Sequence, residues 1–127
     1  MAWQMRMPAR SKYRAVRQTV DGINFASQAE ARRYRELKLL EKAGEIHELK
    51  LQYRMPLLVP TRFAAGTHQI QKIGDYVADF MYCTCCETKC YGREAVIEDV
   101  KGFKTPMYRW KKRHVEVQYG VTIKEIS

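Results

Sequence analysis

The sequence has no long apolar run. No stretch approaches the roughly 20 apolar residues that a helix needs to cross a bilayer. The first eight residues, MAWQMRMP, carry no apolar core of a secretory signal. There is also no internal repeat and no low-complexity segment. These absences exclude a helical membrane span and a repeat array, and we expect a cytoplasmic protein.

Acidic residues are scarce relative to basic ones. The chain has 23 Lys and Arg residues against 14 Asp and Glu residues, which gives a formal net charge of +9. Ten of these cations fall within residues 1–43, and seven lie from Lys101 onward. An excess of this size attracts polyanions and speeds their capture. We therefore expect nucleic acid as the first partner class, an acidic protein as the second and a membrane surface as the third.

A chain of 127 residues, 46% of them hydrophobic, is long enough for one compact domain and too short for two. Residues 1–12 are basic, contain Pro8 and are predicted to form a flexible arm. Residues 13–127 are predicted to form the domain. The domain begins with a short hairpin, which turns at Asp21 and Gly22.

The rest of the domain is predicted to contain both helices and strands. Ser27 and Glu30 have the spacing of a helix capping box, and Thr105 is a suitable cap for a second helix. The predicted order is a helix at 27–43, a strand at 46–59 interrupted near Pro56, a polar loop at 60–74, strands at 76–83 and 94–101, a helix at 105–118 and a strand at 121–126. This order is typical of an α/β protein built on a mixed sheet.

Two acidic residues stand inside apolar strand segments. Asp79 lies in the sequence YVADF, where a carboxylate is costly unless a cation or hydrogen-bond donors compensate it. In the next strand, period-two alternation places Asp99 and Lys101 on one face and Glu98 on the other. If the two strands are neighbours, the carboxyl groups of Asp79 and Asp99 converge. A strand bulge would exchange Glu98 and Asp99.

Two close carboxylates repel each other unless a divalent cation lies between them. With a lysine beside them, they form the set of groups that phosphodiester hydrolysis needs. The alternative interpretation is a surface ion pair between Asp99 and Lys101, with Asp79 as a turn residue. Asp-x-Lys alone occurs by chance in many proteins. The apolar strands, their predicted adjacency and the basic charge of the chain favour the catalytic interpretation.

The spacing from Asp79 to the EDVKG sequence at 98–102 resembles that of the PD-(D/E)XK nuclease superfamily. The helix that carries SQAEARRY at 27–34 is similar to the first core helix of that superfamily. The likeness is closest to a small phage-type branch of endonucleases and Holliday-junction resolvases, and it covers roughly residues 12–126. One feature departs from the pattern, because Ala78 stands where the superfamily has its proline.

The resemblance implies an α/β fold with a single restriction-endonuclease-like αβββαβ core, in which helices flank a mixed β-sheet. It implies that Asp79 and Asp99 bind Mg²⁺ or Mn²⁺, and that Lys101 is the catalytic lysine. Glu30 would then be a third metal contact, often through water. Glu30 also has a structural interpretation, because it can cap its own helix at Ser27, and the two roles are compatible.

The function that the resemblance implies is a metal-dependent DNA endonuclease, a hydrolase of DNA recombination that acts on branched DNA such as a Holliday junction. A resolvase needs two active sites, so a homodimer is implied, and a phage-encoded chain would act in the cytoplasm of its bacterial host. The alternatives are a nuclease that nicks or restricts duplex DNA and a DNA-binding module that has lost the chemistry. Loss of an acid or of the lysine would indicate the inactive module, and here all four residues are present.

Two basic patches are candidate DNA contacts. The second helix and the residues before it offer Lys104, Lys111 and Lys112 to backbone phosphates. The second patch, which can also bind DNA, contains Arg10, Lys12, Arg14 and Arg17. The alternative for each residue is a solvated surface position. Gln52, a polar residue in an apolar strand, either borders the site or is a buried structural glutamine.

The four cysteines, Cys83, Cys85, Cys86 and Cys90, fall within eight residues. Four thiols at a hairpin tip can enclose a structural Zn²⁺. Their spacing is not the usual pair of C-x-x-C knuckles, and adjacent cysteines rarely bind one ion well. Free thiols therefore remain an alternative, and a disulfide is less favoured because the cytoplasm is reducing.

Overall fold

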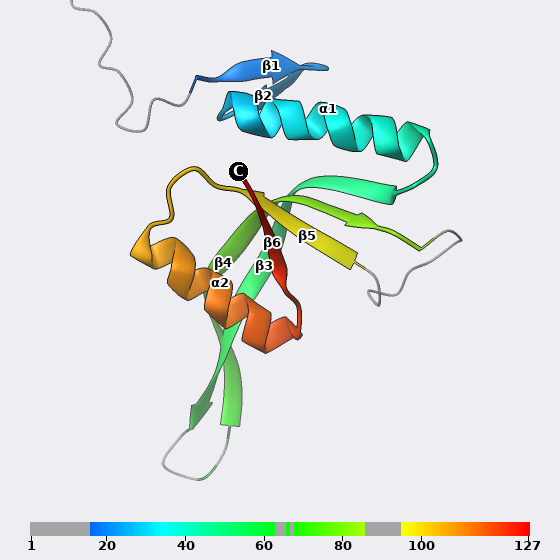
Figure 1. The fold of residues 1–127 in the computed structure, drawn as a ribbon. Helices are drawn as coiled ribbons and strands as arrows, with labels where there is room; N and C mark the ends of the chain where they lie inside the picture. The colour runs from blue at the N-terminus through cyan, green and yellow to red at the C-terminus, as the bar shows by residue number, and fades with distance from the viewer. Residues whose placement is uncertain (1–15, 63–65, 67, 86–94) are drawn as a thin grey trace, which may run out of the picture.

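The computed structural model describes residues 16–62, 66, 68–85 and 95–127 (Figure 1). The chain forms six strands and two helices in this part of the sequence. Their order is β1 (Gln18–Val20), β2 (Ile23–Phe25), α1 (Gln28–Lys42), β3 (His47–Arg62), β4 (His68–Cys83), β5 (Ala95–Val100), α2 (Pro106–Tyr119) and β6 (Ile123–Ile126).

The main sheet has four strands in the order β3-β4-β5-β6. The β3–β4 and β4–β5 pairs are antiparallel, and β5 pairs with β6 in parallel. The predicted mixed α/β fold is therefore confirmed, with the helix and strand order of an αβββαβ core from α1 to β6. The β1–β2 hairpin precedes that core and lies beside α1, away from the main sheet (Figure 1).

The two helices cover opposite faces of the sheet. Residues of β5 that point to opposite faces pack in two separate hydrophobic clusters, one with each helix. On one face, Leu37 of α1 packs in a cluster with Phe80 and Val100. On the other face, Val115 of α2 packs in a cluster with Ile97. Each face of the sheet is thus buried by one helix, which leaves the side chains of β5 almost wholly inside the protein.

Both helices begin at the predicted caps. The Ser27 hydroxyl accepts a hydrogen bond from the backbone N–H of Glu30, and the Thr105 hydroxyl accepts one from the backbone N–H of Tyr108. α2 ends at Gly120, whose φ of 64° lies in the left-handed region that glycine adopts without strain.

The predictions between residues 46 and 74 are wrong in two respects. β3 continues through Pro56, which pairs with Asp75, because β3 is an edge strand and such strands tolerate proline. The predicted loop at 60–74 is instead largely strand, since the β3–β4 ladder extends to the pair of Arg62 and His68. The result is a long two-stranded arm, which passes α2 and whose outer end extends beyond both helices (Figure 1).

The predicted flexible arm at 1–12 lies outside the described residues, as do residues 13–15 at the start of the predicted domain. Within the described part of the chain, neither helix is long and apolar enough to cross a membrane.

Candidate active site

Asp79 lies at a point where the alternation of side chains along β4 is interrupted. Ala78 packs in the core under α2, whereas Phe80 packs in the core under α1. Residues two apart in a regular strand share a face, so the backbone rotates at Asp79. The facing strand changes sides at the same level, where Gln52 has a left-handed φ of 50°.

The carboxylate of Asp79 lies in a fork between β4 and β5. The paired register of these strands ends at Phe80 and Glu98. Beyond that pair, the backbone N–H of Val100 donates a hydrogen bond of 2.8 Å to Oδ2 of Asp79. Nε2 of Gln52 lies 3.5 Å from Oδ1 of the same carboxylate, so Gln52 borders the site.

Asp99 is almost completely buried on the other side of the fork, with a relative exposure of 1%. Its Oδ2 accepts a hydrogen bond from the hydroxyl of Tyr76. Its Oδ1 is buried and accepts no hydrogen bond from the residues that the structure describes, but it forms an ion pair with the Lys101 ammonium, 3.1 Å away. That ammonium also lies 4.9 Å from the ring centroid of Tyr108, at a distance suited to a cation–π contact.

Asp99 lies close enough to Asp79 to affect the pKa of the Asp79 carboxyl. Burial, and then the neighbouring Asp99 carboxyl, raise the pKa of Asp79 to about 7, while the hydrogen bond from Val100 acts in the opposite direction. The charge of Glu30 raises it further. The structure therefore brings Asp79, Asp99 and Lys101 together, as strand alternation and the expected adjacency of the strands predict.

Glu30 lies in the first turn of α1, within electrostatic reach of the same groups. Burial raises the pKa of Glu30, and a backbone hydrogen bond from Ala26 lowers it. The charges of Lys101 and Asp99 also act on this carboxyl, with opposite signs. Only half of the expected capping box is present, since Ser27 caps the helix while the Glu30 carboxylate bonds Ala26 and not Ser27.

Glu98 points away from this site, toward α1. Its fully buried carboxylate accepts two hydrogen bonds from the Arg33 guanidinium, at 2.8 Å and 2.7 Å, and one from the Tyr82 hydroxyl. Burial raises the pKa of Glu98, but these hydrogen bonds more than offset burial and leave the pKa below its usual value. Glu98 thus has a strong cationic partner of its own, and alternation along β5 separates it from Asp99.

A pocket of about 310 Å³ opens between α2 and the outer part of β4. It is lined by Asp75, Tyr76, Val77, Asp99, Lys101, Thr105, Met107, Tyr108 and Lys111. Because Asp99 lines this pocket, a ligand that enters the pocket can approach its side chain.

The donor atoms at this site fit magnesium. The described residues contain no group of three or more His, Cys, Asp and Glu side chains that can hold a metal ion. Asp79 and Asp99 together offer two carboxylates, and Oδ1 of Asp99 has no hydrogen-bond donor. Magnesium in proteins commonly binds through one or two carboxylates and keeps several of its waters, so two carboxylates are sufficient.

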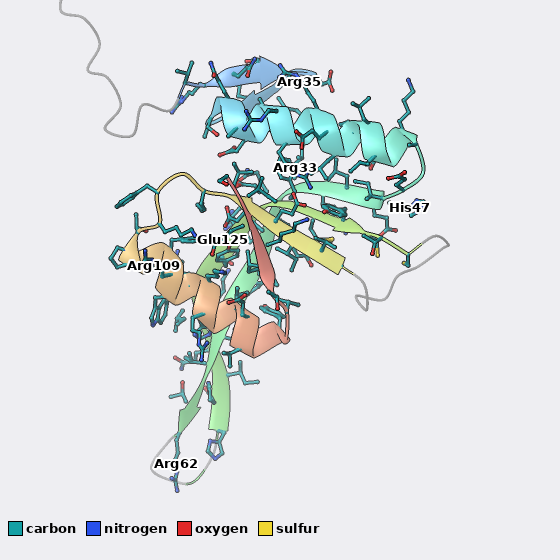
Figure 2. All side chains as sticks on the ribbon, in the orientation of Figure 1. Arg33, Arg35, His47, Arg62, Arg109 and Glu125 are labelled. Carbon is teal, nitrogen blue, oxygen red and sulfur yellow. The ribbon has the colours of Figure 1, made fainter. Side chains whose placement is uncertain are left out.

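The predicted DNA contacts near α2 are engaged with other protein groups. Lys104 and Lys112 both form ion pairs with Glu125, and the Lys111 ammonium donates a hydrogen bond of 3.2 Å to the backbone carbonyl of Asp75. Glu125, near the end of β6, faces the first half of α2 (Figure 2). The contacts predicted for Arg10, Lys12 and Arg14 lie outside the described residues.

The cysteine cluster is described only in part. Cys83 is a free, buried thiol, and its sulfur lies 3.5 Å from that of Cys85, which is in a disulfide bond. Cys86 and Cys90 lie outside the described residues. The zinc site that four cysteines could form stays a prediction, and it requires Cys85 as a thiolate and not in a disulfide bond.

Sequence reasoning did not assign a role to four residues that support the site. Tyr76 contacts Asp99 and Tyr108 contacts Lys101, but neither tyrosine had a local signal, because each lies on a different element from the residue that it contacts. Arg33 stands three residues after Glu30, and therefore on the same face of α1, so an inward-facing arginine was detectable. Glu125 had no local signal, because only the parallel pairing of β5 and β6 brings it beside Asp99.

A family model described as "Protein of unknown function (DUF1064)" matches residues 10–125, nearly the whole chain. The chain belongs to this family. No curated protein and no solved structure matches it. The DUF1064 match spans both core helices and most of the main sheet, so it covers the two strands that carry Asp79 and Asp99.

Proposed function

We propose that the protein is a DNA endonuclease that depends on Mg²⁺ or Mn²⁺, with Asp79, Asp99, Lys101 and Glu30 in its active site. One observation supports this most strongly. Two buried carboxyl groups from splayed neighbouring strands, those of Asp79 and Asp99, lie close together, and Asp99 forms an ion pair with the Lys101 ammonium in the wall of an open pocket. Buried acids that lack an equal number of cations are a typical feature of sites that bind divalent metals.

Each residue of the site has a separate role in the proposed reaction. Asp79 and Asp99 would hold the metal, and Glu30, in the first turn of α1, would be a third contact. A metal bound there would offset charge on the phosphate and supply hydroxide from bound water. Lys101 is oriented by the Asp99 carboxylate and by the Tyr108 ring, so its ammonium can orient water or stabilise negative charge on the phosphate.

DNA is the proposed partner because the net charge of +9 favours a polyanion. The proposal of branched DNA as the substrate, with a homodimer that cuts both strands, rests on the resemblance to the resolvase branch. The proposed location is the cytoplasm, where such DNA is present. A nuclease that nicks or restricts plain duplex DNA is the alternative with the same active site.

The test compares wild type with Asp99→Ala on labelled four-way junction, flap and plain duplex, each with Mg²⁺ and with EDTA. We expect cleavage only by wild type with Mg²⁺, and faster on the junction. Cleavage by the variant or in EDTA would contradict the metal chemistry. Equal cutting of plain duplex would remove the preference for branches and leave the nuclease. Binding without any cutting would favour the inactive DNA-binding module.

A further inference from the structure

The two-stranded arm has a surface that the active site does not explain. It is formed by the outer halves of β3 and β4, and Arg62 lies near its tip (Figure 2). Every residue of 68–73 is exposed, whichever face of the ribbon it occupies. Ile70 is 75% exposed and Ile73 is 49% exposed. Two exposed isoleucines on a β4 segment whose residues are all exposed indicate that this strand is an interaction surface.

The charge of the arm favours a polyanion as that partner. Residues 54–74 contain three Lys and Arg residues, one histidine and no acid. Two of the cations, Arg54 and Lys72, form ion pairs of 3.1 Å with the same carboxylate, that of Asp75 at the base of the arm. Both cations remain more than half exposed, so phosphates can reach them. Arg62, at the far end, extends the positive charge to the tip.

The outer edge of β3 is closed to a further strand. Pro56 and Pro60 have no N–H group to offer. Between them, the Leu58 N–H donates a hydrogen bond of 2.8 Å to the Gln118 side chain, and the Leu58 carbonyl lies 3.0 Å from the His114 ring. An edge whose backbone groups are occupied in this way resists strand addition. This argues against pairing with a second copy along β3.

The arm is continuous with the candidate active site. Asp75, Tyr76 and Val77, at its base, form one wall of the pocket that contains Asp99 and Lys101. From Asp75 the strand runs seven residues to His68, which is about 24 Å at ~3.4 Å per residue. That length corresponds to about seven base pairs, at ~3.4 Å for each step of one DNA strand.

We propose that the arm is a DNA-binding ribbon that lies in the major groove of the duplex beside the cleavage site. The major groove of B-DNA admits a two-stranded β-ribbon. Lys72 and Arg62 contact phosphates, and Ile70 and Gln71 lie on the two opposite faces of β4, where they can meet base edges or the walls of the groove. This inference rests on the proposed nuclease function, since the active site fixes where the duplex lies.

The test measures the affinity of the full chain for labelled duplex DNA in EDTA over a range of salt concentrations. Arg62→Ala with Lys72→Ala should weaken binding about tenfold and reduce the slope of log K against log salt by about two. The matched control, Arg35→Ala with Lys42→Ala, removes the same charge from α1 and should change the slope much less. Footprinting of wild type should show protection of about seven base pairs on one side of the cut, and the arm variant should lose that protection.

The two proposals fail in distinguishable ways. Asp99→Ala should lose cutting but keep the affinity and the footprint, because Asp99 lies in the pocket and not on the arm. An arm variant with the affinity, slope and footprint of wild type overturns the inference, even if wild type cuts DNA. An arm variant that sediments as a smaller species while its DNA binding is unchanged also overturns it, and assigns the arm to a second copy. Binding that depends on the arm without cutting by wild type contradicts the nuclease alone.

Discussion

Arg33→Ala gives the sharpest test of how β5 is held in place. Arg33 is the only guanidinium bonded to Glu98 among the described residues, and the carboxylate of Glu98 has no solvent exposure. Truncation leaves that charge with the Tyr82 hydroxyl and with the Lys124 ammonium at 3.9 Å. A buried charge that loses its partner is among the most destabilising changes that a single substitution makes.

The expected size of the effect follows from the burial of the pair. Breaking a buried ion pair by removing one partner costs about 3–5 kcal/mol. The Arg33 side chain is 17% exposed, so water can enter when it is removed, and the Tyr82 hydrogen bond remains. We therefore expect a value of about 3 kcal/mol, at the lower end of the range. With an unfolding entropy of about 0.27 kcal/mol/K for 127 residues, the melting temperature should fall by about 11 °C.

The pH dependence of this loss identifies its cause. In wild type the pKa of Glu98 is lowered, so its contribution to stability is present above the unfolded pKa and is lost as pH falls through the folded pKa. Without Arg33, burial dominates and raises the pKa of Glu98, so the lone carboxyl takes up a proton in mild acid. The difference in free energy of unfolding between wild type and variant should therefore be largest near pH 8 and shrink toward pH 4.

Urea unfolding at a series of pH values measures the difference. Arg35→Ala, an exposed position on the same helix, is the matched control and should change stability by less than about 0.5 kcal/mol. Arg33→Ala combined with Glu98→Gln should recover part of the loss, because no charge is then left buried. A loss below about 1 kcal/mol, or one that is constant from pH 4 to pH 8, would refute the reasoning.

Four further predictions concern the acidic site and the residues around it. Because the pKa of Asp79 is raised to about 7, the metal-free protein should lose stability as pH rises from about 4 to 7, and Asp79→Asn should remove that trend in thermal melts. Mg²⁺ at about 100 times its Kd should stabilise wild type by about 2.7 kcal/mol at pH 8, less at pH 5, and should leave Asp99→Asn unchanged. Tyr108→Leu removes a cation–π contact of about 0.5–1 kcal/mol, so single-turnover cutting should slow about two- to fivefold if that contact positions Lys101. Glu125→Gln releases Lys104 and Lys112, so DNA affinity at low salt should rise about fivefold; no rise would show that these lysines do not meet DNA.

The elements that local signals specify were predictable from the sequence. The Asp21–Gly22 turn, the caps at Ser27 and Thr105 and the stop at Gly120 each depend on a few adjacent residues. The pairing of β4 with β5 was predictable for a similar reason, because the two strands are separated by a short connection. Those signals were sufficient to place Asp79 beside the strand that carries Asp99.

The arm and the ion pair of Glu98 depend on tertiary position, so local signals misled or were absent. Pro56 and Pro60 favour a loop unless the strand lies at a sheet edge, and the sequence does not show which strand is at the edge. The partner of Glu98 is Arg33, 65 positions earlier, and their contact exists only because α1 packs across β5. The change of face at Gln52 requires a left-handed φ that a glutamine seldom adopts, so alternation alone could not predict it.

Glu98 and Asp99 show how charge is balanced on the two sides of one strand. The single carboxylate of Glu98 accepts two hydrogen bonds from the guanidinium of Arg33. On the other face, the Lys101 ammonium forms an ion pair with Asp99, no ion pair of Asp79 is seen among the described residues, and the Glu30 carboxyl adds further negative charge. The folded protein tolerates this imbalance because the raised pKa of Asp79, about 7, lets Asp79 keep its proton up to near neutral pH. A divalent cation would supply the positive charge that this face lacks. Metal binding should therefore displace the proton of Asp79. Replacing either Asp79 or Asp99 by asparagine should abolish metal binding.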